Sequence, residues 1–324
     1  MINELTLSNF RGFGSLELKG LKRVNLIVGH NNTGKTSLLE GVLLVSDPNA
    51  FSQLPGVFRP AQGNPNLRFF RWLVKDGSQN KDTVLSRKSD KELEAIKILM
   101  RGNGHPQLGG SVPPEFFGPI ANQLGGLFLY STRNQLGLVC KTVSVQHRDI
   151  NFLVTLIGKA YRKKGAEESL QKILADIDSR IKKVRIDPGE DAEGNQIIVD
   201  IGLSELVPLS QVGQGVFRVT AILADIIGEQ PDVLLIDEIE NGLHHSVMAQ
   251  VWAGLAAIAE NLNVQIFATT HSGECLQAAH KAFQKRETYD LAVIQLFRND
   301  SGAQGRVLDQ EHIKAAIAED IELR

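Results

Sequence analysis

The sequence predicts an α/β fold with a mixed β-sheet, antiparallel strands near the N-terminus and a partly helical insertion. Residues 3–9 and 14–19 alternate apolar and polar side chains on either side of an Arg11-Gly12 break, which is the pattern of a strand pair. Short, almost continuously apolar runs next to helical stretches are typical of buried strands in a parallel sheet. Three runs of this kind occur, at residues 24–28, 233–236 and 264–268.

The chain divides into three parts that we expect to form one composite domain. Residues 1–46 make an N-terminal lobe, residues 47–200 an insertion with a helical subdomain, and residues 201–324 a C-terminal lobe. Between 47 and 125 the composition shifts to Pro, Gly, Asn and mixed charge, which predicts an irregular insertion with some strands. Apolar patterning predicts a core strand at 127–130, helices at 152–164 and along the stripe from Leu170 to Val184, a hairpin around 187–201, a strand at 291–297 and a helix at 312–321.

Composition excludes several classes of protein. The formal net charge of −2 argues against a globally basic nucleic-acid binder, although it leaves a local positive patch open. Cys140 and Cys275 are the only cysteines and lack metal-ligand spacing, which favours reduced thiols. No apolar stretch approaches the roughly 18 residues that a membrane span needs, and the N-terminus lacks a signal-peptide pattern, so we expect a cytoplasmic protein without membrane contact.

The strongest motif is Gly29-His30-Asn31-Asn32-Thr33-Gly34-Lys35-Thr36, which lies between the predicted strand 24–28 and a helix that begins near Ser37. A glycine-rich turn in this position presents backbone N–H groups and a helix N-terminus to an anion. Lysine then bridges β- and γ-phosphates, and the threonine hydroxyl ligates Mg²⁺. The predicted nucleotide contacts are Gly29, Asn31, Asn32, Thr33, Gly34, Lys35, Thr36 and Ser37.

Polar side chains also follow the two other apolar runs. Asp237 and Glu238 come directly after residues 233–236, and His271 follows residues 264–268. Ligands of open parallel sheets sit beyond the carboxyl ends of the strands, so we expect these groups to face the phosphate loop. Asp237 fits a magnesium partner and Glu238 a general base. Considered alone, the acids fit a solvated turn and His271 a structural histidine, but the phosphate loop favours functional roles.

These motifs resemble the ABC-type ATPase family, in the branch that contains chromosome-maintenance and recombination ATPases and the OLD-like (overcoming lysogenisation defect) proteins. The resemblance rests on the phosphate loop, the signature-like segment 209–215, the acidic run 235–244, the segment 268–272 and the opening 9–13. It does not cover residues from about 47 to 150. It implies a P-loop ABC-type nucleotide-binding fold, ATP and Mg²⁺ as cofactors, and a homodimer that forms on ATP.

The resemblance also implies roles for individual residues. Ser210 and Gly213 would face the γ-phosphate of the partner copy, although Gln211-Val212-Gly213-Gln214-Gly215 departs from the common spacing of that signature. Arg11 would lie near the nucleotide, and Glu240 and Asn241 near the dimer interface. The family's metal-sensing glutamine matches either Gln135 or Gln146, and the sequence does not choose between them.

Several alternatives remain open at this stage. A GTPase is disfavoured because Asn80-Lys81-Asp82-Thr83 lacks the final acid of the guanine-reading motif. About fifty residues follow His271, too few for the nuclease domain of many OLD-like relatives. DNA maintenance and phage defence both fit, with DNA or an effector protein as partner. The main alternative is a low-turnover, ATP-dependent switch that regulates a separate nuclease or toxin.

Overall fold

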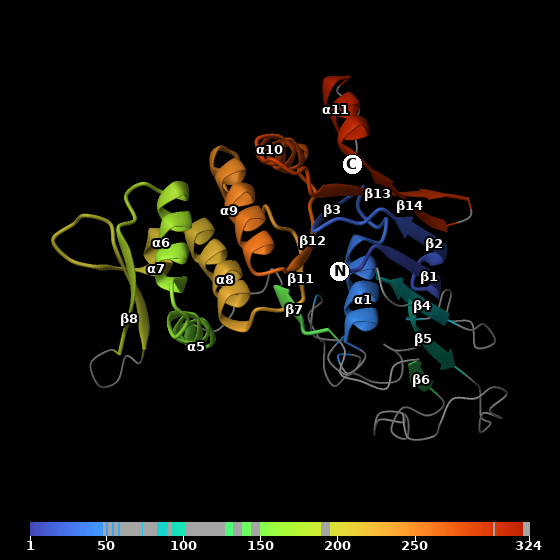
Figure 1. Cartoon of the computed structure of the whole chain (residues 1–324), viewed down its shortest axis with the longest axis horizontal. Coiled ribbons are helices and arrows are strands. Elements are labelled where there is room, and N and C mark those ends of the chain that lie inside the picture. Colours follow the sequence, from blue (N-terminus) through green and yellow to red (C-terminus); the bar gives the residue numbers. More distant parts are fainter. Residues whose placement is uncertain are drawn as a thin grey trace.

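The computed structural model describes residues 1–47, 50, 54, 58, 73, 83–89, 93–100, 127–131, 138–143, 150–188, 195–300 and 302–319. In this part of the chain the strands form one sheet of eleven and a second sheet of three (Figure 1). The strands of the large sheet are β1 (Glu4–Phe10), β2 (Phe13–Lys19), β3 (Val24–Val28), β4 (Thr83–Lys88), β5 (Leu93–Met100), β6 (Leu127–Ser131), β7 (Cys140–Val143), β11 (Val233–Ile236), β12 (Gln265–Thr269), β13 (Leu291–Asn299) and β14 (Gly302–Leu308). The small sheet contains β8 (Lys183–Asp187), β9 (Gln196–Asp200) and β10 (Val207–Pro208).

The helices lie on both faces of the large sheet. The described α-helices are α1 (Lys35–Ser46), α5 (Ile150–Tyr161), α6 (Ala166–Ile177), α7 (Leu209–Val212), α8 (Gln214–Glu229), α9 (Met248–Asn261), α10 (Gly273–Gln284) and α11 (Gln310–Ala318). A short 3₁₀ helix, η4 (His245–Val247), precedes α9. No helix in the described ranges is both long and apolar enough to cross a membrane.

The large sheet has the order β6-β5-β4-β1-β2-β14-β13-β3-β12-β11-β7. Neighbouring strands from β13 to β7 run parallel, whereas β1, β2, β4, β5 and β6 pair in antiparallel fashion. β14 is antiparallel to β13 and meets β2 through the single pair Ala303 and Phe13. The strand β12 therefore lies between β3, which leads into the phosphate loop, and β11, which leads into the acidic pair.

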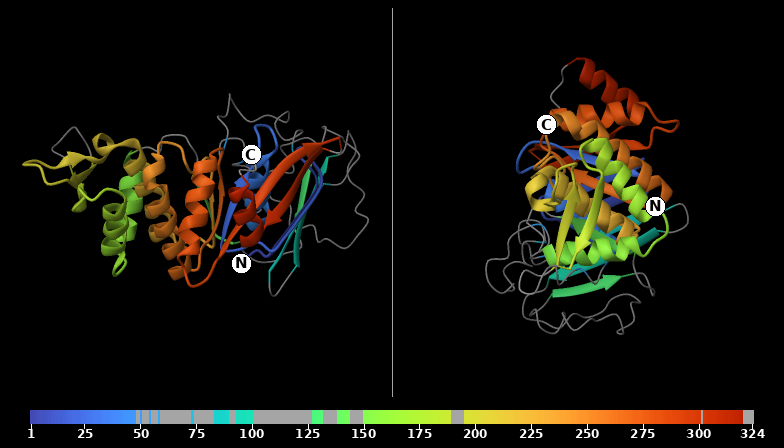
Figure 2. Two further views of the ribbon diagram at one scale, coloured as in Figure 1. Left: turned by 90° about the horizontal axis from the view of Figure 1, so that it is seen from above. Right: turned by 90° about the vertical axis from the view of Figure 1, so that its left-hand side faces the viewer.

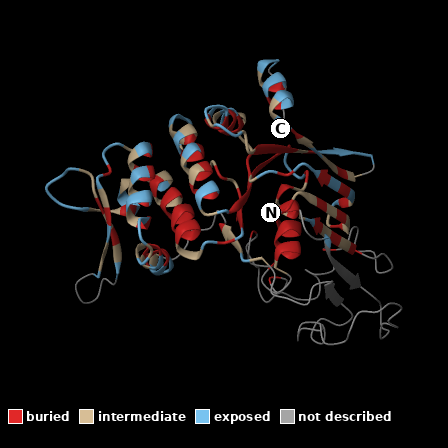
Figure 3. Cartoon of the chain, in the orientation of Figure 1, coloured by how far each residue is buried: buried red, intermediate tan, exposed pale blue. Residues whose placement is uncertain are grey.

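Alternating side chains of the central strands build a hydrophobic core on each face. Leu234 and Ile236 of β11 join one core with α8, α9 and α10, while Val233 and Leu235 join the other core with α1. Helix α1 is buried along almost its whole length because β1, β2 and β4 curve around its outer side (Figure 3). Helices α9, α8 and α6 form successive layers away from the sheet, and the small sheet lies at the far end (Figures 1 and 2).

The structure confirms the predicted strand pair, the three buried strands, the mixed sheet and the hairpin, which is formed by β8 and β9. Two predictions were wrong in part. The apolar stripe from Leu170 to Val184 is not one helix, because α6 ends at Ile177 and Val184 belongs to β8, although all of its apolar residues are buried in one core. Residues 127–130 do form a strand, β6, but it lies at one edge of the sheet and not in its centre. The strands β7, β10 and β14 were not predicted from the sequence.

A buried glutamine ties the N-terminus to the centre of the sheet. Gln265, on β12, is only 1% exposed. Its Oε1 accepts a hydrogen bond from Ile2 N at 2.7 Å, and its Nε2 donates to Ile2 O and Lys22 O, each at 2.8 Å. The two bonds to Ile2 satisfy backbone groups that would otherwise be buried unpaired, and the third joins the turn before β3, where Lys22 O also accepts a hydrogen bond from Asn25.

We expect Gln265→Leu to lower the free energy of unfolding by about 2–3 kcal/mol, because it leaves the N–H and carbonyl groups of the buried Ile2 without their hydrogen-bond partner. Urea denaturation would measure the change. Gln277→Leu, at an exposed position of α10, is the control and should stay within about 0.5 kcal/mol of wild type. Equal stability of the two variants would contradict a structural role for the Gln265 hydrogen bonds.

Candidate functional site

The phosphate loop requires glycine at both of its ends. Gly29 has a φ of 148°, and a Cβ there would lie 2.4 Å from the Leu296 carbonyl oxygen. Gly34 has a φ of 106°, and a Cβ there would lie 2.8 Å from the Phe13 ring. Side chains at these positions would meet both strained dihedrals and rigid neighbours, so the glycines fix the shape of the loop.

Lys35 is the first residue of α1 and is buried at the floor of the loop. Its Nζ donates hydrogen bonds to the carbonyl oxygens of Gly29 at 2.5 Å and His30 at 2.9 Å. Burial lowers the pKa of Lys35 against the attraction of Glu240 and the neighbouring acids. The ammonium group thus lies at the N-terminus of a helix, where the helix dipole and the loop N–H groups also favour an anion.

The two acids at the end of β11 are positioned by a threonine at the end of β12. Thr269 Oγ1 donates a hydrogen bond to Asp237 Oδ1 at 2.6 Å and accepts one from Glu238 N at 2.8 Å. Asp237 is buried, whereas the Glu238 side chain is 40% exposed. Glu238 has a φ of 49°, an uncommon conformation for a residue with a side chain, which points to a locally constrained turn.

An arginine from α8 holds the same turn from the other side. Arg218 Nη2 donates to the carbonyl oxygens of Asp237 at 2.6 Å and Glu238 at 2.8 Å. Burial lowers the pKa of Arg218, while Glu240, Glu238 and Asp237 act in the opposite direction. Helix α8 begins within the signature-like segment. The Arg218 side chain therefore connects this segment to the two acids at the end of β11.

His271 completes the group of polar strand ends. Its Nε2 lies 3.9 Å from Glu238 Oε1, and its backbone N–H donates to Glu240 Oε1 at 2.6 Å. The other Glu240 oxygen, Oε2, is buried without a hydrogen-bond partner in the described structure. An imidazole and a partly exposed carboxylate at this separation can together orient a water molecule or a phosphate oxygen.

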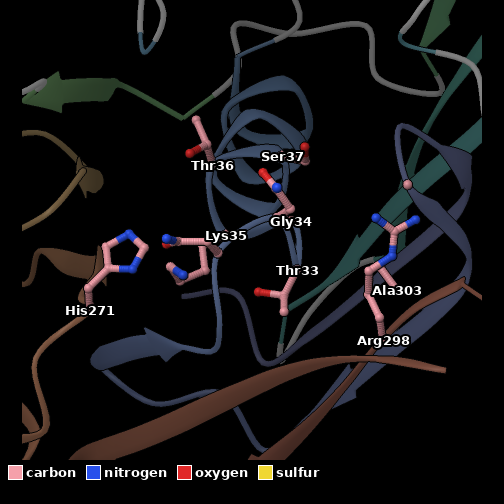
Figure 4. Close-up of a pocket in the computed structure, with 11 residues that line it drawn as sticks. Thr33, Gly34, Lys35, Thr36, Ser37, His271, Arg298 and Ala303 are labelled. Atoms are coloured by element: carbon pink, nitrogen blue, oxygen red, sulfur yellow. The ribbon is translucent and has the colours of Figure 1, made fainter. Parts of the chain in front are cut away.

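A cavity of about 620 Å³ opens beside the loop (Figure 4). Its lining residues come from the β1–β2 turn, the phosphate loop, the segment after β12 and the β13–β14 hairpin. They are Gly12, Asn31, Asn32, Thr33, Gly34, Lys35, Thr36, Ser37, His271, Arg298 and Ala303. In Figure 4 the His271 ring and the Arg298 guanidinium lie on opposite sides of the loop.

The structure brings most of the predicted site residues together. Every predicted loop contact except the buried Gly29 lines the cavity, as does His271. Glu238 lies 3.9 Å from His271 and shares Thr269 with Asp237, but neither acid is among the residues that line the cavity. Ser210 and Gly213 do not line it either. Ser210 is exposed within the short helix α7, and Gly213 directly precedes α8.

Arg11 takes a different place from the one that the resemblance implied. Its guanidinium forms a buried ion pair with Glu40 of α1, with Nε 2.8 Å from Oε2 and Nη2 3.0 Å from Oε1. The next residue, Gly12, lines the cavity instead. Gln135 and Gln146, the two candidates for a metal-sensing glutamine, lie outside the described residues.

Thr269, Arg218 and Arg298 were given no role from the sequence. Thr269 directly follows the predicted strand 264–268 and Arg298 directly follows the predicted strand 291–297, so both could have been found by the rule that ligands sit at strand ends. Arg218 lies within a helix, three residues after the end of the signature-like segment 209–215, and no local pattern distinguishes it from a solvated arginine.

Solved structures share this fold. The crystal structure of the "SmcHead bound to the C-winged helix domain of ScpA" aligns with a TM-score of 0.60 at 15% identity, covering 97% of this chain and 99% of that one. The Smc head domain with an extended coiled coil derived from Pyrococcus furiosus aligns with a TM-score of 0.58 at 11% identity, covering 99% of each chain. The chain therefore has the fold of an SMC head, a P-loop fold of the ABC type.

Two family models match separate parts of the sequence. Residues 1–99 match an "AAA ATPase domain", and residues 127–275 match a family described as "AAA domain, putative AbiEii toxin, Type IV TA system". With the fold and the phosphate loop, these matches support an ATPase of the ABC-type P-loop fold.

Within this class, two curated relatives are informative. An "ATP/GTP phosphatase" of Helicobacter pylori is 23% identical over 89% of this chain and 90% of its own length. A "DNA replication and repair protein RecF" of Idiomarina loihiensis is 39% identical over 71 residues, which are 21% of this chain and 20% of that protein. The long match to the Helicobacter protein supports nucleotide hydrolysis.

We expect Thr269→Val to reduce nucleotide hydrolysis by about 10- to 100-fold, because the hydroxyl that fixes Asp237 and the Glu238 backbone is lost. Steady-state phosphate release over a Mg²⁺ titration would measure it. Thr269→Ser keeps the hydroxyl and is the matched control. Full activity of the valine variant would show that Thr269 does not position the acids.

Proposed function

We propose that the chain hydrolyses ATP to ADP and phosphate at a composite site formed by two copies of itself. The observation that carries this proposal is the arrangement of strand ends: the loop after β3, the acids after β11 and His271 after β12 lie at one edge of the sheet. The reaction is proposed for ATP, since the sequence lacks a guanine-reading motif. The named activity of the Helicobacter relative includes GTP, so a nucleotide panel belongs in every assay.

The donor set near the loop fits Mg²⁺. Thr36 supplies a hydroxyl and Asp237 a buried carboxylate, and oxygen ligands of this kind suit a magnesium ion that keeps several waters and binds phosphates. Within the described ranges, no group of three or more His, Cys, Asp or Glu residues is placed so that it could hold a metal ion by itself. Bound Mg²⁺ would neutralise charge on the transferring phosphoryl group.

Glu238 and His271 are the residues proposed to act on the attacking water and the γ-phosphate. The Glu238 carboxylate is partly exposed and follows the buried Asp237, so it can accept a proton from an attacking water. His271 lines the cavity within 3.9 Å of that carboxylate and can donate a hydrogen bond to the γ-phosphate. Lys35 stabilises the β- and γ-phosphate charge from the floor of the loop.

The second copy is proposed to contribute Ser210 and Gly213. Ser210 is exposed in the short helix α7 and Gly213 directly precedes α8, and neither residue lines the cavity of its own chain. Nothing within 4 Å would meet a Cβ at Gly213, so its backbone is open to an approaching phosphate. A partner related by two-fold symmetry would place this segment over the γ-phosphate of the first copy.

We further propose that the ATP cycle acts in DNA maintenance or phage defence, with DNA or an effector protein as partner. The local match to RecF and the toxin–antitoxin description of the matching family support this setting. Affinity capture on immobilised Glu238→Gln protein with ATP, followed by sequencing of bound DNA and mass spectrometry of bound protein, tests it. Recovery of neither class above a Lys35→Ala control would refute it.

We expect Glu238→Gln to bind ATP, lose at least about 100-fold in turnover and remain a dimer, because the base is removed and the binding groups are kept. Lys35→Ala should lose ATP binding and stay monomeric. Light scattering after gel filtration, with and without ATP and Mg²⁺, would measure both. A monomer in every condition would contradict the composite site. Unchanged turnover of Glu238→Gln would instead favour the low-turnover switch.

Mixing two inactive variants tests the trans arrangement directly. Lys35→Ala and Ser210→Arg proteins should each be inactive on their own. In an equal mixture, half of the dimers are mixed and each has one intact composite site, so up to roughly a quarter of the wild-type rate should return. No recovery would show that the loop and the signature-like segment do not act across two copies.

A further inference from the structure

The order of strands in the sheet gives the nucleotide cavity two chemically different ends. Across the sheet the order is β13-β3-β12-β11. The acids follow β11 and His271 follows β12, so the reacting γ-phosphate belongs on that side of the phosphate loop. Arg298, near the end of β13, lines the cavity on the other side of the loop (Figure 4). A triphosphate that runs along the loop therefore directs its nucleoside toward Arg298.

The neighbours of Arg298 at this end of the cavity have small side chains. The residue is exposed and stands opposite Ala303 in the β13–β14 hairpin, and Gly12 is the next lining residue on that side. Ala303 and Gly12 have almost no side chain, so they leave room for a planar group. Within the described part of the chain, the Arg298 guanidinium forms no hydrogen bond or ion pair.

The other groups near this end are already engaged. The Arg11 side chain is only 7% exposed and is paired with the fully buried carboxylate of Glu40. Phe13 is fully buried and packs beneath Gly34. The described lining residues include no Phe, Tyr or Trp, so an arginine is the planar side chain that this end of the cavity offers.

We propose that Arg298 binds the nucleoside, with its guanidinium stacked on the purine base of the bound triphosphate. This inference rests on the proposed nucleotide site and adds the residue that holds the end of the ligand away from the chemistry. A guanidinium is planar, always charged and weakly hydrated, and it stacks on aromatic faces in a way that an ammonium does not. Because every purine has such a face, Arg298 should strengthen the binding of ATP and GTP alike.

Binding of Mg²⁺-ATP, Mg²⁺-GTP and inorganic tripolyphosphate, measured by calorimetry, tests this role. Arg298→Ala should weaken ATP and GTP about tenfold, the size of a partly desolvated stacking contact, and change tripolyphosphate less than about twofold. Arg298→Lys should not restore ATP affinity, because it keeps the charge but loses the plane. Arg306→Ala is the matched control: this exposed arginine of the same hairpin bonds Gln295 and does not line the cavity.

Three results would overturn the inference. An equal loss of tripolyphosphate affinity would place Arg298 on the phosphates, recovery by lysine would reduce its role to charge, and unchanged ATP affinity would remove it from the site. The proposed function has a separate criterion, since it fails when wild-type protein binds neither ATP nor tripolyphosphate or when Lys35→Ala binds both as wild type does. Thermal melting of each arginine variant would verify that the exposed substitutions leave the fold intact.

Discussion

The site depends on the parallel register of three neighbouring strands. Because β12 pairs with β3 on one side and with β11 on the other, the phosphate loop, the acidic pair and His271 all emerge at one edge of the sheet. Thr269, at the end of the middle strand β12, joins the strand ends through its hydrogen bonds to Asp237 and Glu238. Two hydrophobic cores hold the strands, since alternate residues of β11 are buried on opposite faces.

A second set of contacts joins the acids to the surface that is proposed to meet a partner. Arg218 of α8 binds the carbonyl groups of Asp237 and Glu238, and Gly215 approaches the next loop so closely that a Cβ would lie 2.7 Å from the Gly242 carbonyl oxygen. Movement of the signature-like segment therefore cannot leave the Glu238 turn unaffected, because a packed interior transmits displacement. In the proposed dimer, occupancy of one composite site would in this way influence the acids of the other.

Arg11 and Arg298 both lie near the cavity, but they differ in burial and therefore in what they can bind. Arg11 and Glu40 are buried together, and removing one member of such a pair leaves a buried charge uncompensated. Arg11 therefore fastens the β1–β2 turn to α1. Arg298 carries the same guanidinium group but is exposed at a strand end, where a ligand can reach it. The two arginines have the same guanidinium group and differ only in the residues that surround it.

The sequence by itself determined the α/β class, the phosphate loop and the polar ends of two further strands, because these depend on local patterns of apolar residues, glycines and acids. It did not place β6 at the edge of the sheet or end α6 at Ile177, since both depend on packing against distant segments. Only the tertiary structure decided that Arg11 pairs with Glu40, that Arg218 reaches the acidic turn and that Arg298 lines the cavity. The bonds of Arg218 and Arg11 join residues 19 and 29 positions apart, and Arg298 shares its cavity with Gly12, which lies 298 − 12 = 286 positions away. Local patterning carries no information about distance over such separations.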